Sequence, residues 1–312
     1  MDLYSNFEWY YFDLHNPDDY DLVCTIHPKP FNSVFDIVIF DIFIYREKKC
    51  LLHHFFTLPA KNINETKKPY ILFYDDNNYL KKTDNIYQIK LKDEKLDLEF
   101  SLTDLLKNNK PATIELLPET CKNQNFKWIV YAPFCLGEAA IRWDKNNLFL
   151  SGKGYHDYNS GSVNLKRKLK YWYWGKYFFN DNLLVYGYII ASNGEIRRIA
   201  VLIKDKNLFI DDNPQFSKKD DILSFTVNNK SYSFKMQDAE VLDNISFYMS
   251  SFSMKLKMLV KVLEVVFFVS SKSMLMIPVR KLFGNVSYKR SINSGLMTDG
   301  TTVSCFFEEM KF

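Results

Sequence analysis

Apolar and polar residues alternate with a period of two along most of the chain. The alternation is cleanest in residues 87–92 and 96–102, two short runs that a polar turn separates. This period places one side of each run in a core and the other in solvent, so it predicts a β-hairpin. Residues 34–45 are apolar on both sides apart from two aspartates. That pattern is typical of a strand with both faces buried.

Further strands are predicted along the chain, with turn residues between them. Asn193 and Gly194 form the Asn-Gly pair that favours a tight hairpin turn. The other predicted strands cover residues 8–13, 51–58, 113–117, 128–131, 148–152, 183–191, 196–203, 207–210, 222–227 and 231–235. This many strands, with no long helix before residue 250, predict an all-β protein made of antiparallel sandwiches or barrels.

One segment departs from the strand pattern. In residues 254–269, apolar side chains recur at helical spacing and lysines lie among them. We expect one helix there, packed on a barrel in the C-terminal part of the chain. A helix with a lysine-rich polar face also binds membrane surfaces, so peripheral membrane contact through residues 254–269 is the alternative. The segment is too short and too charged to span a bilayer.

Composition narrows the class of protein. Aromatic residues make up 17% of the 312 residues, and this enrichment favours strands. The 41 basic and 37 acidic residues nearly balance, whereas a nucleic-acid binder normally carries a basic surface. We therefore expect no nucleic-acid partner. The N-terminus lacks a basic segment followed by an apolar one, so we expect no signal peptide and a cytoplasmic location, with or without membrane association.

The densest candidate chemistry lies in residues 151–175. His156 is one of only five histidines, and Asp157 follows it directly. Histidine titrates near neutrality and burial raises the pKa of a carboxyl, so either residue could act as a general acid or base. Neighbours on a strand point to opposite faces, so only one faces a given cavity unless a bulge intervenes. The alternative role is structural, with both side chains hydrogen-bonded to irregular backbone.

Aromatic residues follow this pair within a short distance. Trp172 and Trp174 share one face of a predicted strand. Their rings either line an apolar pocket, where they stabilise a carbocation by cation–π contact, or fill a core. Tyr186 and Tyr188 share a face of the next strand and are either ligand contacts or ordinary barrel aromatics. The full set of expected substrate contacts is Trp9, Tyr155, Tyr158, Asn159, Trp172, Trp174, Tyr186 and Tyr188.

Glu8 begins a predicted strand that is rich in aromatic side chains. If it is buried, two interpretations are open. Its carboxyl either has a raised pKa and acts as an acid, or forms a structural ion pair. We expect the ion pair, with Arg142 or Arg167 as the partner.

The remaining histidines predict no metal site. His53 and His54 are adjacent, so they cannot both point inward from a regular strand, and no third ligand lies near them in sequence. His15 and His27 are expected to lie in loops. The chain also lacks a glycine-rich phosphate loop, a GxSxG elbow and an HExxH helix. We therefore expect neither a metal nor an organic cofactor.

Three separated segments match the motifs of one known family. Residues 7–13 (FEWYYFD) resemble an EWWYFD motif, and residues 152–161 (GKGYHDYNSG) resemble a GxGYHDHNWG motif. Residues 171–175 (YWYWG) resemble the WWWG motif that follows. In these segments the chain resembles the carotenoid 1,2-hydratase (hydroxyneurosporene synthase) and AttH-like superfamily. The resemblance implies two lipocalin-like β-barrel domains packed together, which we expect at residues 1–165 and 166–312.

The chain departs from the family motif at positions that the resemblance implicates in catalysis. Tyr158 stands in place of the motif's second histidine, and Ser160 stands in place of its tryptophan. The hydratases also have a Tyr/Asp pair in the next strand. Here that strand, residues 183–188, keeps the tyrosine as Tyr186 but contains no acidic residue. The resemblance therefore predicts the fold more firmly than it predicts carotenoid hydration.

The residues and the resemblance together predict a cofactor-independent enzyme of the lyase or isomerase class. Its substrate would be a hydrophobic isoprenoid or polyene, and its reaction a proton-initiated cyclisation, isomerisation or hydration. His156 or Asp157 would supply or relay the proton. Two alternatives stay open. One is a pericyclase of the Diels–Alderase type, which gains rate by orienting a polyene. The other is a non-catalytic lipid- or pigment-binding protein.

Overall fold

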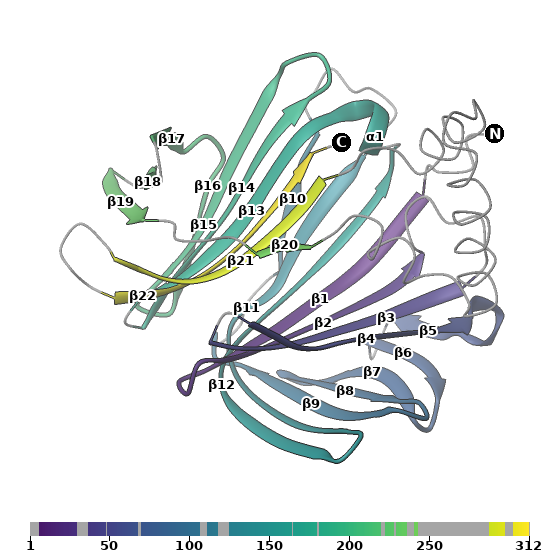
Figure 1. Ribbon diagram of the computed structural model, residues 1–312. Helices are drawn as coiled ribbons and strands as arrows, with labels where there is room; N and C mark the ends of the chain where they lie inside the picture. Colours follow the sequence, from purple (N-terminus) through teal and green to yellow (C-terminus); the bar gives the residue numbers. More distant parts are fainter. Residues whose placement is uncertain are drawn as a thin grey trace, which may run out of the picture.

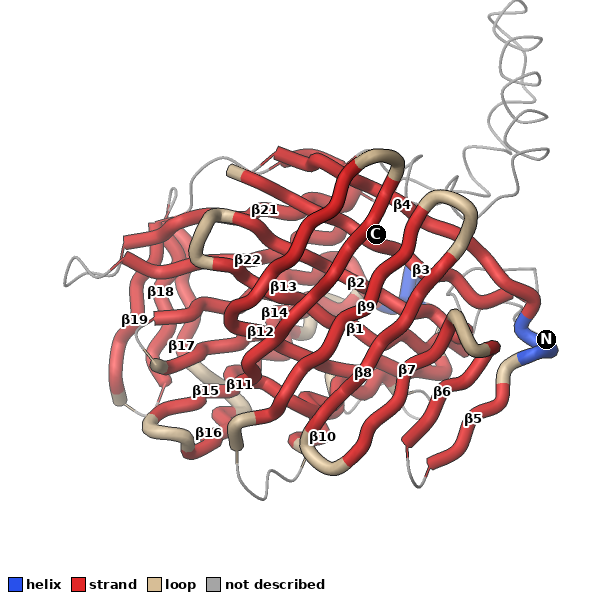
Figure 2. Tube along the Cα trace, turned by 90° about the horizontal axis from the view of Figure 1, so that it is seen from below, coloured by secondary structure: helices blue, strands red, loops and turns tan. Residues whose placement is uncertain are grey.

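The described part of the chain is built almost entirely from antiparallel strands. The computed structural model describes residues 6–29, 37–47, 49–67, 70–106, 111–117, 125–163, 165–179, 181–219, 222–227, 229–235, 240–242, 287–296 and 302–311. These residues form one sheet of twelve strands, one of seven and one of three. Figure 1 shows β1–β9 in one group and β13–β22 in another, with the long strands β11 and β12 extending between them, and Figure 2 shows the same strands from below.

The twelve-stranded sheet holds every strand before residue 163. Its spatial order is β4-β3-β2-β1-β12-β11-β9-β8-β7-β6-β5, with β10 paired to β11. The strands are β1 (Asn6–Asn16), β2 (Tyr20–Lys29), β3 (Ile37–Arg46), β4 (Lys49–Pro59), β5 (Asn64–Lys67), β6 (Tyr70–Asp75), β7 (Asn78–Thr83), β8 (Ile86–Lys92), β9 (Leu96–Asp104), β10 (Ala112–Glu115), β11 (Phe126–Trp143) and β12 (Asn146–Ser162). A single 3₁₀ turn, η1 (Ala60–Asn62), follows β4.

The other two sheets follow a four-residue helix, α1 (Leu165–Lys168). The seven-stranded sheet has the order β16-β15-β14-β13-β22-β21-β20, and β17, β18 and β19 form the small sheet. These strands are β13 (Leu169–Phe179), β14 (Asn182–Ala191), β15 (Ile196–Lys204), β16 (Asn207–Asp211), β17 (Gln215–Lys219), β18 (Ile222–Val227), β19 (Lys230–Lys235), β20 (Glu240–Leu242), β21 (Ser287–Leu296) and β22 (Thr302–Lys311).

The twelve-stranded sheet curls around its own apolar core, here called the N-terminal core. Phe40 and Phe56 from one end of the sheet share this core with Leu80 from near the other end. The imidazole Nε2 of His54 on β4 also lies 2.9 Å from Oδ2 of Asp93, which follows β8. Contacts between distant strands of one sheet are what a barrel-like closure produces.

Two further cores lie beyond the N-terminal core. The inter-sheet core joins the two large sheets and contains Trp9, Trp128 and Tyr155 from the first and Trp174 and Val185 from the second. The C-terminal core packs the small sheet against the inner face of the seven-stranded sheet. Its members are Tyr173, Tyr177, Phe179, Leu184, Tyr186, Ala200, Leu202, Phe225, Val227 and Tyr232.

The all-β, lipocalin-like fold predicted from the sequence is confirmed. The Asn193–Gly194 turn is also confirmed, because Gly194 has a φ of 89° and its N–H donates to the carbonyl of Ala191. The helix expected at residues 254–269 lies outside the described residues. The division into domains 1–165 and 166–312 stays a prediction, although the change of sheet falls near the same point.

The strands predicted at residues 128–131 and 148–152 are confirmed but are longer than expected, and the loop positions expected for two histidines were wrong. The two strands are parts of β11 and β12, which have 18 and 17 residues. Both strands pass from the N-terminal core to the inter-sheet core, so their alternation breaks where both faces are buried. His15 and His27 lie in β1 and β2 rather than in loops. Strand β2 is buried on both faces and so shows no alternation.

Within the described ranges, no helix is long and apolar enough to cross a lipid bilayer.

Candidate active site

The side chains of His156 and Asp157 lie in different cores. The His156 ring packs in the N-terminal core, where it stacks on Phe12 with a centroid distance of 3.9 Å. The Asp157 carboxylate lies on the opposite face, among the residues of the inter-sheet core. The expected alternation therefore holds. The register of β11 against β12 does shift between Val130 and Ala132, but this irregularity leaves the two side chains on opposite faces.

Asp157 is buried and fully engaged by donors. The indole Nε1 of Trp128 and the hydroxyl of Tyr155 both donate to its Oδ2 at 2.8 Å. The amide Nδ2 of Asn159 donates to its Oδ1 at 2.9 Å. Burial raises the pKa of Asp157 to about 7, although the bonds from Tyr155 and Trp128 oppose the rise. The carboxyl therefore exchanges a proton near neutral pH.

An aromatic layer covers Asp157 in the inter-sheet core. The Trp174 ring lies 5.7 Å from the Tyr155 ring and 5.2 Å from the Tyr11 ring, between centroids. Trp172, on the same face of β13, lies 6.0 Å from Trp9. The structure thus brings four of the predicted contact residues, Trp9, Tyr155, Trp172 and Trp174, into one layer with Asp157. Trp174 is buried, whereas Trp172 is only partly buried.

A buried ion pair borders this layer and was not predicted from the sequence. The Lys176 ammonium donates to Asp13 Oδ1, and each residue is only 3% exposed. The Lys176 Nζ also lies 5.5 Å from the Tyr155 ring centroid. Burial raises the pKa of Asp13, and the charge of Lys176 counteracts the rise. The only sequence signal was a charged residue at the end of each of two aromatic runs.

His156 is held as a neutral imidazole. Its Nδ1 lies 2.9 Å from the carbonyl oxygen of Tyr11, so the ring N–H donates there. Its Nε2 is buried and has no hydrogen-bond partner among the described residues. Burial lowers the pKa of His156 to about 3. The ring also contacts Tyr131 and Tyr87, at centroid distances of 5.5 Å and 4.6 Å.

Tyr158 and Glu8 lie on the His156 side of the sheet. The Tyr158 ring packs 4.6 Å from Tyr10, and burial raises its pKa. Glu8 forms an ion pair, as expected, but its partner is Lys29. The expectation of Arg142 as partner was wrong, because that guanidinium pairs with Asp97 of β9, at 2.7 Å. Arg167, the other expected partner, lies on α1, whereas the cation that pairs with Glu8 is that of Lys29.

The structure does not bring Tyr186 and Tyr188 near Asp157. The Tyr186 ring packs 4.4 Å from Phe225 in the C-terminal core, and the Tyr188 ring lies 4.5 Å from Phe216. Gly187 lies between them and faces the inter-sheet core, because a Cβ added there would lie 3.9 Å from Trp128. If Tyr186 and Tyr188 contact a substrate, they do so at a site other than the one around Asp157.

Polar residues of β2, β3 and β4 share the Asp157 face of the sheet and were also missed. The ring of His27 lies 6.2 Å from that of Trp9, and its Nε2 lies 3.3 Å from the hydroxyl of Thr25. Burial lowers the pKa of His27 to about 4. The Nε2 of His53 lies 2.9 Å from Oδ1 of Asp41. Because His27 was expected in a loop, this group of polar side chains was not predicted from the sequence.

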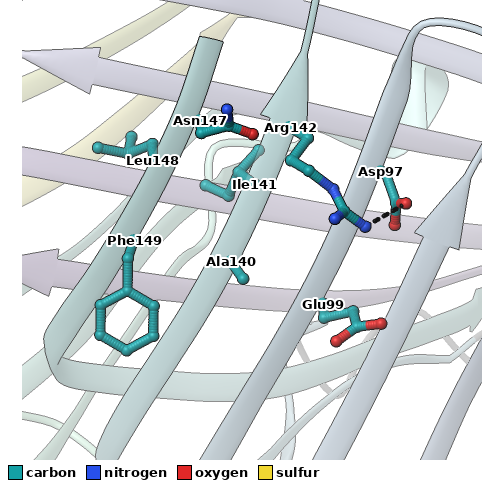
Figure 3. A pocket seen from close by; sticks show the side chains of 8 residues that line it. All are labelled: Asp97, Glu99, Ala140, Ile141, Arg142, Asn147, Leu148 and Phe149. Carbon is teal, nitrogen blue, oxygen red and sulfur yellow. Dashed lines mark hydrogen bonds and ion pairs between the residues drawn. The ribbon is translucent and has the colours of Figure 1, made fainter.

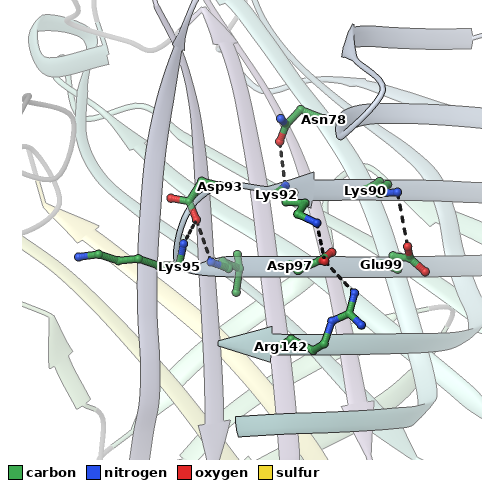
Figure 4. Close-up of polar contacts among 9 residues, drawn as sticks. Asn78, Lys90, Lys92, Asp93, Lys95, Asp97, Glu99 and Arg142 are labelled. Carbon is green, nitrogen blue, oxygen red and sulfur yellow. Dashed lines mark hydrogen bonds and ion pairs between the residues drawn. The ribbon is translucent and has the colours of Figure 1, made fainter. Parts of the chain in front are cut away.

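A groove on the outer surface lies apart from the inter-sheet core. It measures about 350 Å³ and is lined by residues of β9, β11 and β12 (Figure 3), namely Asp97, Glu99, Ala140, Ile141, Arg142, Asn147, Leu148 and Phe149. Its charges are paired (Figure 4): Asp97 lies 2.7 Å from Arg142 and 3.2 Å from Lys92, and Glu99 lies 3.6 Å from Lys90. These exposed pairs account for the groove's charged residues without a ligand.

Known proteins match this chain in sequence over its middle part and in structure over nearly its whole length. Residues 110–253 match the family model described as carotenoid hydratase CrtC. No curated protein matches the sequence. The match to the family model supports the expectation of a hydratase-type enzyme with a hydrophobic small-molecule substrate.

Three solved structures share the fold. A protein described as AttH from Nitrosomonas europaea is 12% identical, with a TM-score of 0.59 over 99% of this chain and 92% of its own. CghA is 7% identical, with a TM-score of 0.62 over 98% of this chain and 88% of its own. Kievitone hydratase from Nectria haematococca is 8% identical, with a TM-score of 0.53 over 99% and 89%. Together with the family match, they confirm the resemblance carried by the three motifs.

Proposed function

Since the middle of the chain matches carotenoid hydratases, we propose that this protein is a hydratase- or cyclase-type enzyme that protonates a hydrophobic isoprenoid or polyene. One observation carries the proposal: a carboxyl whose pKa burial raises to about 7, that of Asp157, lies in a layer of aromatic rings. A general acid works best when its pKa lies near the working pH. Asp157 meets that condition.

Tyr155 is the group through which the proton leaves Asp157. When Asp157 is protonated, its O–H needs an acceptor. Three described groups donate hydrogen bonds to the carboxyl. The indole of Trp128 and the amide nitrogen of Asn159 can only donate, whereas the Tyr155 hydroxyl can also accept. The Tyr155 hydroxyl gives its proton to a substrate double bond as it takes the proton of Asp157.

The protonated substrate carries a carbocation, and the aromatic layer suits it. The new C–H bond uses the two π electrons of the double bond, so the positive charge stays on the neighbouring carbon and Asp157 becomes a carboxylate. The π-faces of Trp9, Trp172 and Trp174 attract such a cation. Loss of a proton then gives an isomer, attack by a second double bond gives a ring, and attack by water gives an alcohol.

Replacement of Asp157 by asparagine tests the proposal. The variant D157N keeps the size of the side chain and removes the acid. The probes are farnesol, geranylgeraniol and lycopene, with products followed by mass spectrometry. We expect D157N to lose about 100-fold or more in kcat, the usual contribution of a general acid. The matched control is D144N, at an exposed turn residue with a φ of 50° that asparagine also adopts. Near-normal turnover by folded D157N would contradict the proposal.

A pericyclase is the second candidate, and the burial of Asp157 favours it. The carboxylate is 2% exposed and both of its oxygens accept hydrogen bonds. The aromatic layer would then act by orienting a polyene, without proton transfer. In that case D157N retains turnover, while Trp172→Ala and Trp174→Ala lose it. Stoichiometric binding of the probes without product would instead indicate a carrier.

A further inference from the structure

Four residues form one row across the twelve-stranded sheet. Asp157 on β12 lies directly opposite Tyr11 on β1, Tyr11 opposite Thr25 on β2, and Thr25 opposite Asp41 on β3. Directly opposite residues of neighbouring strands point to the same face. Asp41 is therefore on the same face as Asp157. It is three strands away, which corresponds to ~14 Å at the usual strand spacing.

Asp41 holds a histidine at this far end of the row. Its Oδ1 lies 2.9 Å from Nε2 of His53, and Asp41 itself is only 3% exposed. The His53 ring stacks on Phe43 at a centroid distance of 4.0 Å. In the tautomer whose Nε2–H donates to the Asp41 carboxylate, the lone pair lies on Nδ1. A histidine fixed by a buried carboxylate in this way is a general base whose cation the carboxylate stabilises.

His53 belongs to a second row parallel to the first. Tyr155 lies opposite Asp13, Asp13 opposite Val23, Val23 opposite Phe43, and Phe43 opposite His53. Tyr155, Val23 and Phe43 are all members of the inter-sheet core. The two rows thus place the proposed proton donor at one side of this face and the Asp41–His53 pair at the other. The positions between them are those of Tyr11, Thr25, Asp13, Val23 and Phe43.

We propose that Asp41 and His53 are the proton acceptor that ends the reaction begun at Asp157, which rests on the proposed function of that carboxyl. The substrate would be an extended acyclic isoprenoid that lies across the strands and reaches both groups. Protonation would occur at one part of the chain and deprotonation at a double bond distant from it. A compact substrate with a single reactive double bond would not require the second group.

Every proton in this step has a donor and an acceptor. For cyclisation or isomerisation, Nδ1 of His53 takes a proton from a carbon next to the cation, and the electrons of that C–H bond form the new double bond. For hydration, water forms the C–O bond and His53 takes its proton. The imidazolium then releases the proton to solvent, because the His53 side chain is 27% exposed. Asp157 regains its proton from solvent before the next turnover.

The neighbouring residue provides a matched control. His54 points to the other face of β4, and its Nε2 lies 2.9 Å from a carboxylate oxygen of Asp93. The two histidines therefore have the same partner chemistry on opposite faces of one strand. Substitution of either by glutamine keeps an N–H donor for the carboxylate and removes the base. A purely structural role predicts similar effects for H53Q and H54Q.

The test compares H53Q, H54Q, D41N and D157N with the parent protein, using farnesol, geranylgeraniol and lycopene as probes. We expect H53Q and D41N to reduce kcat about 10-fold to 100-fold and to shift the ratio of alkene to alcohol products. H54Q should match the parent protein in both. Circular dichroism confirms folding, and D41N decides the question if H53Q does not fold.

The outcomes of this test separate the present inference from the proposed function. An inactive D157N together with parent-like rates and product ratios for H53Q and D41N would overturn the role of Asp41 and His53 alone. Full activity of D157N, or no turnover of any probe by the parent protein, would overturn both. Equal losses in H53Q and H54Q would also overturn the present inference, because they would indicate a structural effect.

Discussion

The hydroxyl of Tyr155 lies 2.8 Å from Oδ2 of Asp157, the carboxyl that it would connect to a substrate. Replacement by phenylalanine keeps the ring in the aromatic layer. Of the three described side chains that donate to Asp157, it removes the one that can also accept a proton. We expect Y155F to lose about 100-fold in kcat with little change in KM, since the hydroxyl acts in proton transfer. Steady-state kinetics with the probe that the parent protein turns over fastest checks this.

Tyr87→Phe is the control for that measurement. The Tyr87 hydroxyl is also buried, but it belongs to the N-terminal core and has no hydrogen-bond partner among the described residues. Loss of a buried hydroxyl alone should therefore leave kcat within a few-fold of the parent value. Equal losses of activity in Y155F and Y87F would exclude a specific role for Tyr155.

The rate should fall with pH above neutrality. The active form of Asp157 is the protonated one, and burial raises its pKa to about 7. We therefore expect kcat/KM to fall about tenfold for each pH unit above this value. A profile of kcat/KM against pH checks the prediction. A flat profile between about pH 5 and about pH 9 would favour the pericyclase instead.

Asp157 should also make stability depend on pH. Its pKa rises from 3.8 in the unfolded chain to about 7 in the native protein, so the native state binds the extra proton between these values. Stability from this group is present below pH 3.8 and is lost as the pH rises to about 7. Asparagine does not titrate. The unfolding free energy of D157N minus that of the parent should therefore rise by up to about 4 kcal/mol across this window.

Urea denaturation of both proteins at about pH 5 and about pH 8 should capture about 2–3 kcal/mol of this rise, and taking the difference cancels the contributions of other groups. His156 is one such group: burial lowers its pKa to about 3, so its contribution has the opposite sign. A difference that stays constant with pH would mean that Asp157 is ionised throughout.

The buried pair of Asp13 and Lys176 should matter for stability. Loss of one partner leaves an uncompensated charge in the inter-sheet core, where both residues are 3% exposed. We expect Lys176→Met to reduce the unfolding free energy by about 3–5 kcal/mol. The double variant D13N/K176M should recover part of this loss, and a double-mutant cycle measures the coupling. Additive effects of the two substitutions would contradict a direct ion pair.

Local pattern was enough to predict much of the site. The two-residue period placed His156 and Asp157 on opposite faces of β12 and put Trp172 and Trp174 together. Both statements concern one strand, and strand geometry alone decides them. The all-β class followed in the same way, from many short alternating runs.

Tertiary packing decided what local pattern could not. Asp13 and Lys176 are 163 residues apart in sequence, and they meet only because β1 and β13 contact the same core. Tyr186 and Tyr188 point away from the inter-sheet core because Gly187 takes the position facing Trp128. The row from Asp157 to Asp41 depends on strand register across four strands, which no single stretch of sequence encodes.

Deuterium labelling tests the central claim, that the reaction begins with a proton from the protein. The parent protein is incubated with each probe in D₂O, and the product is analysed by mass spectrometry and NMR. Transfer from Asp157 through Tyr155 predicts one deuterium on carbon in every product molecule, and loss of both product and label in D157N. A product that carries no carbon-bound deuterium would contradict the account.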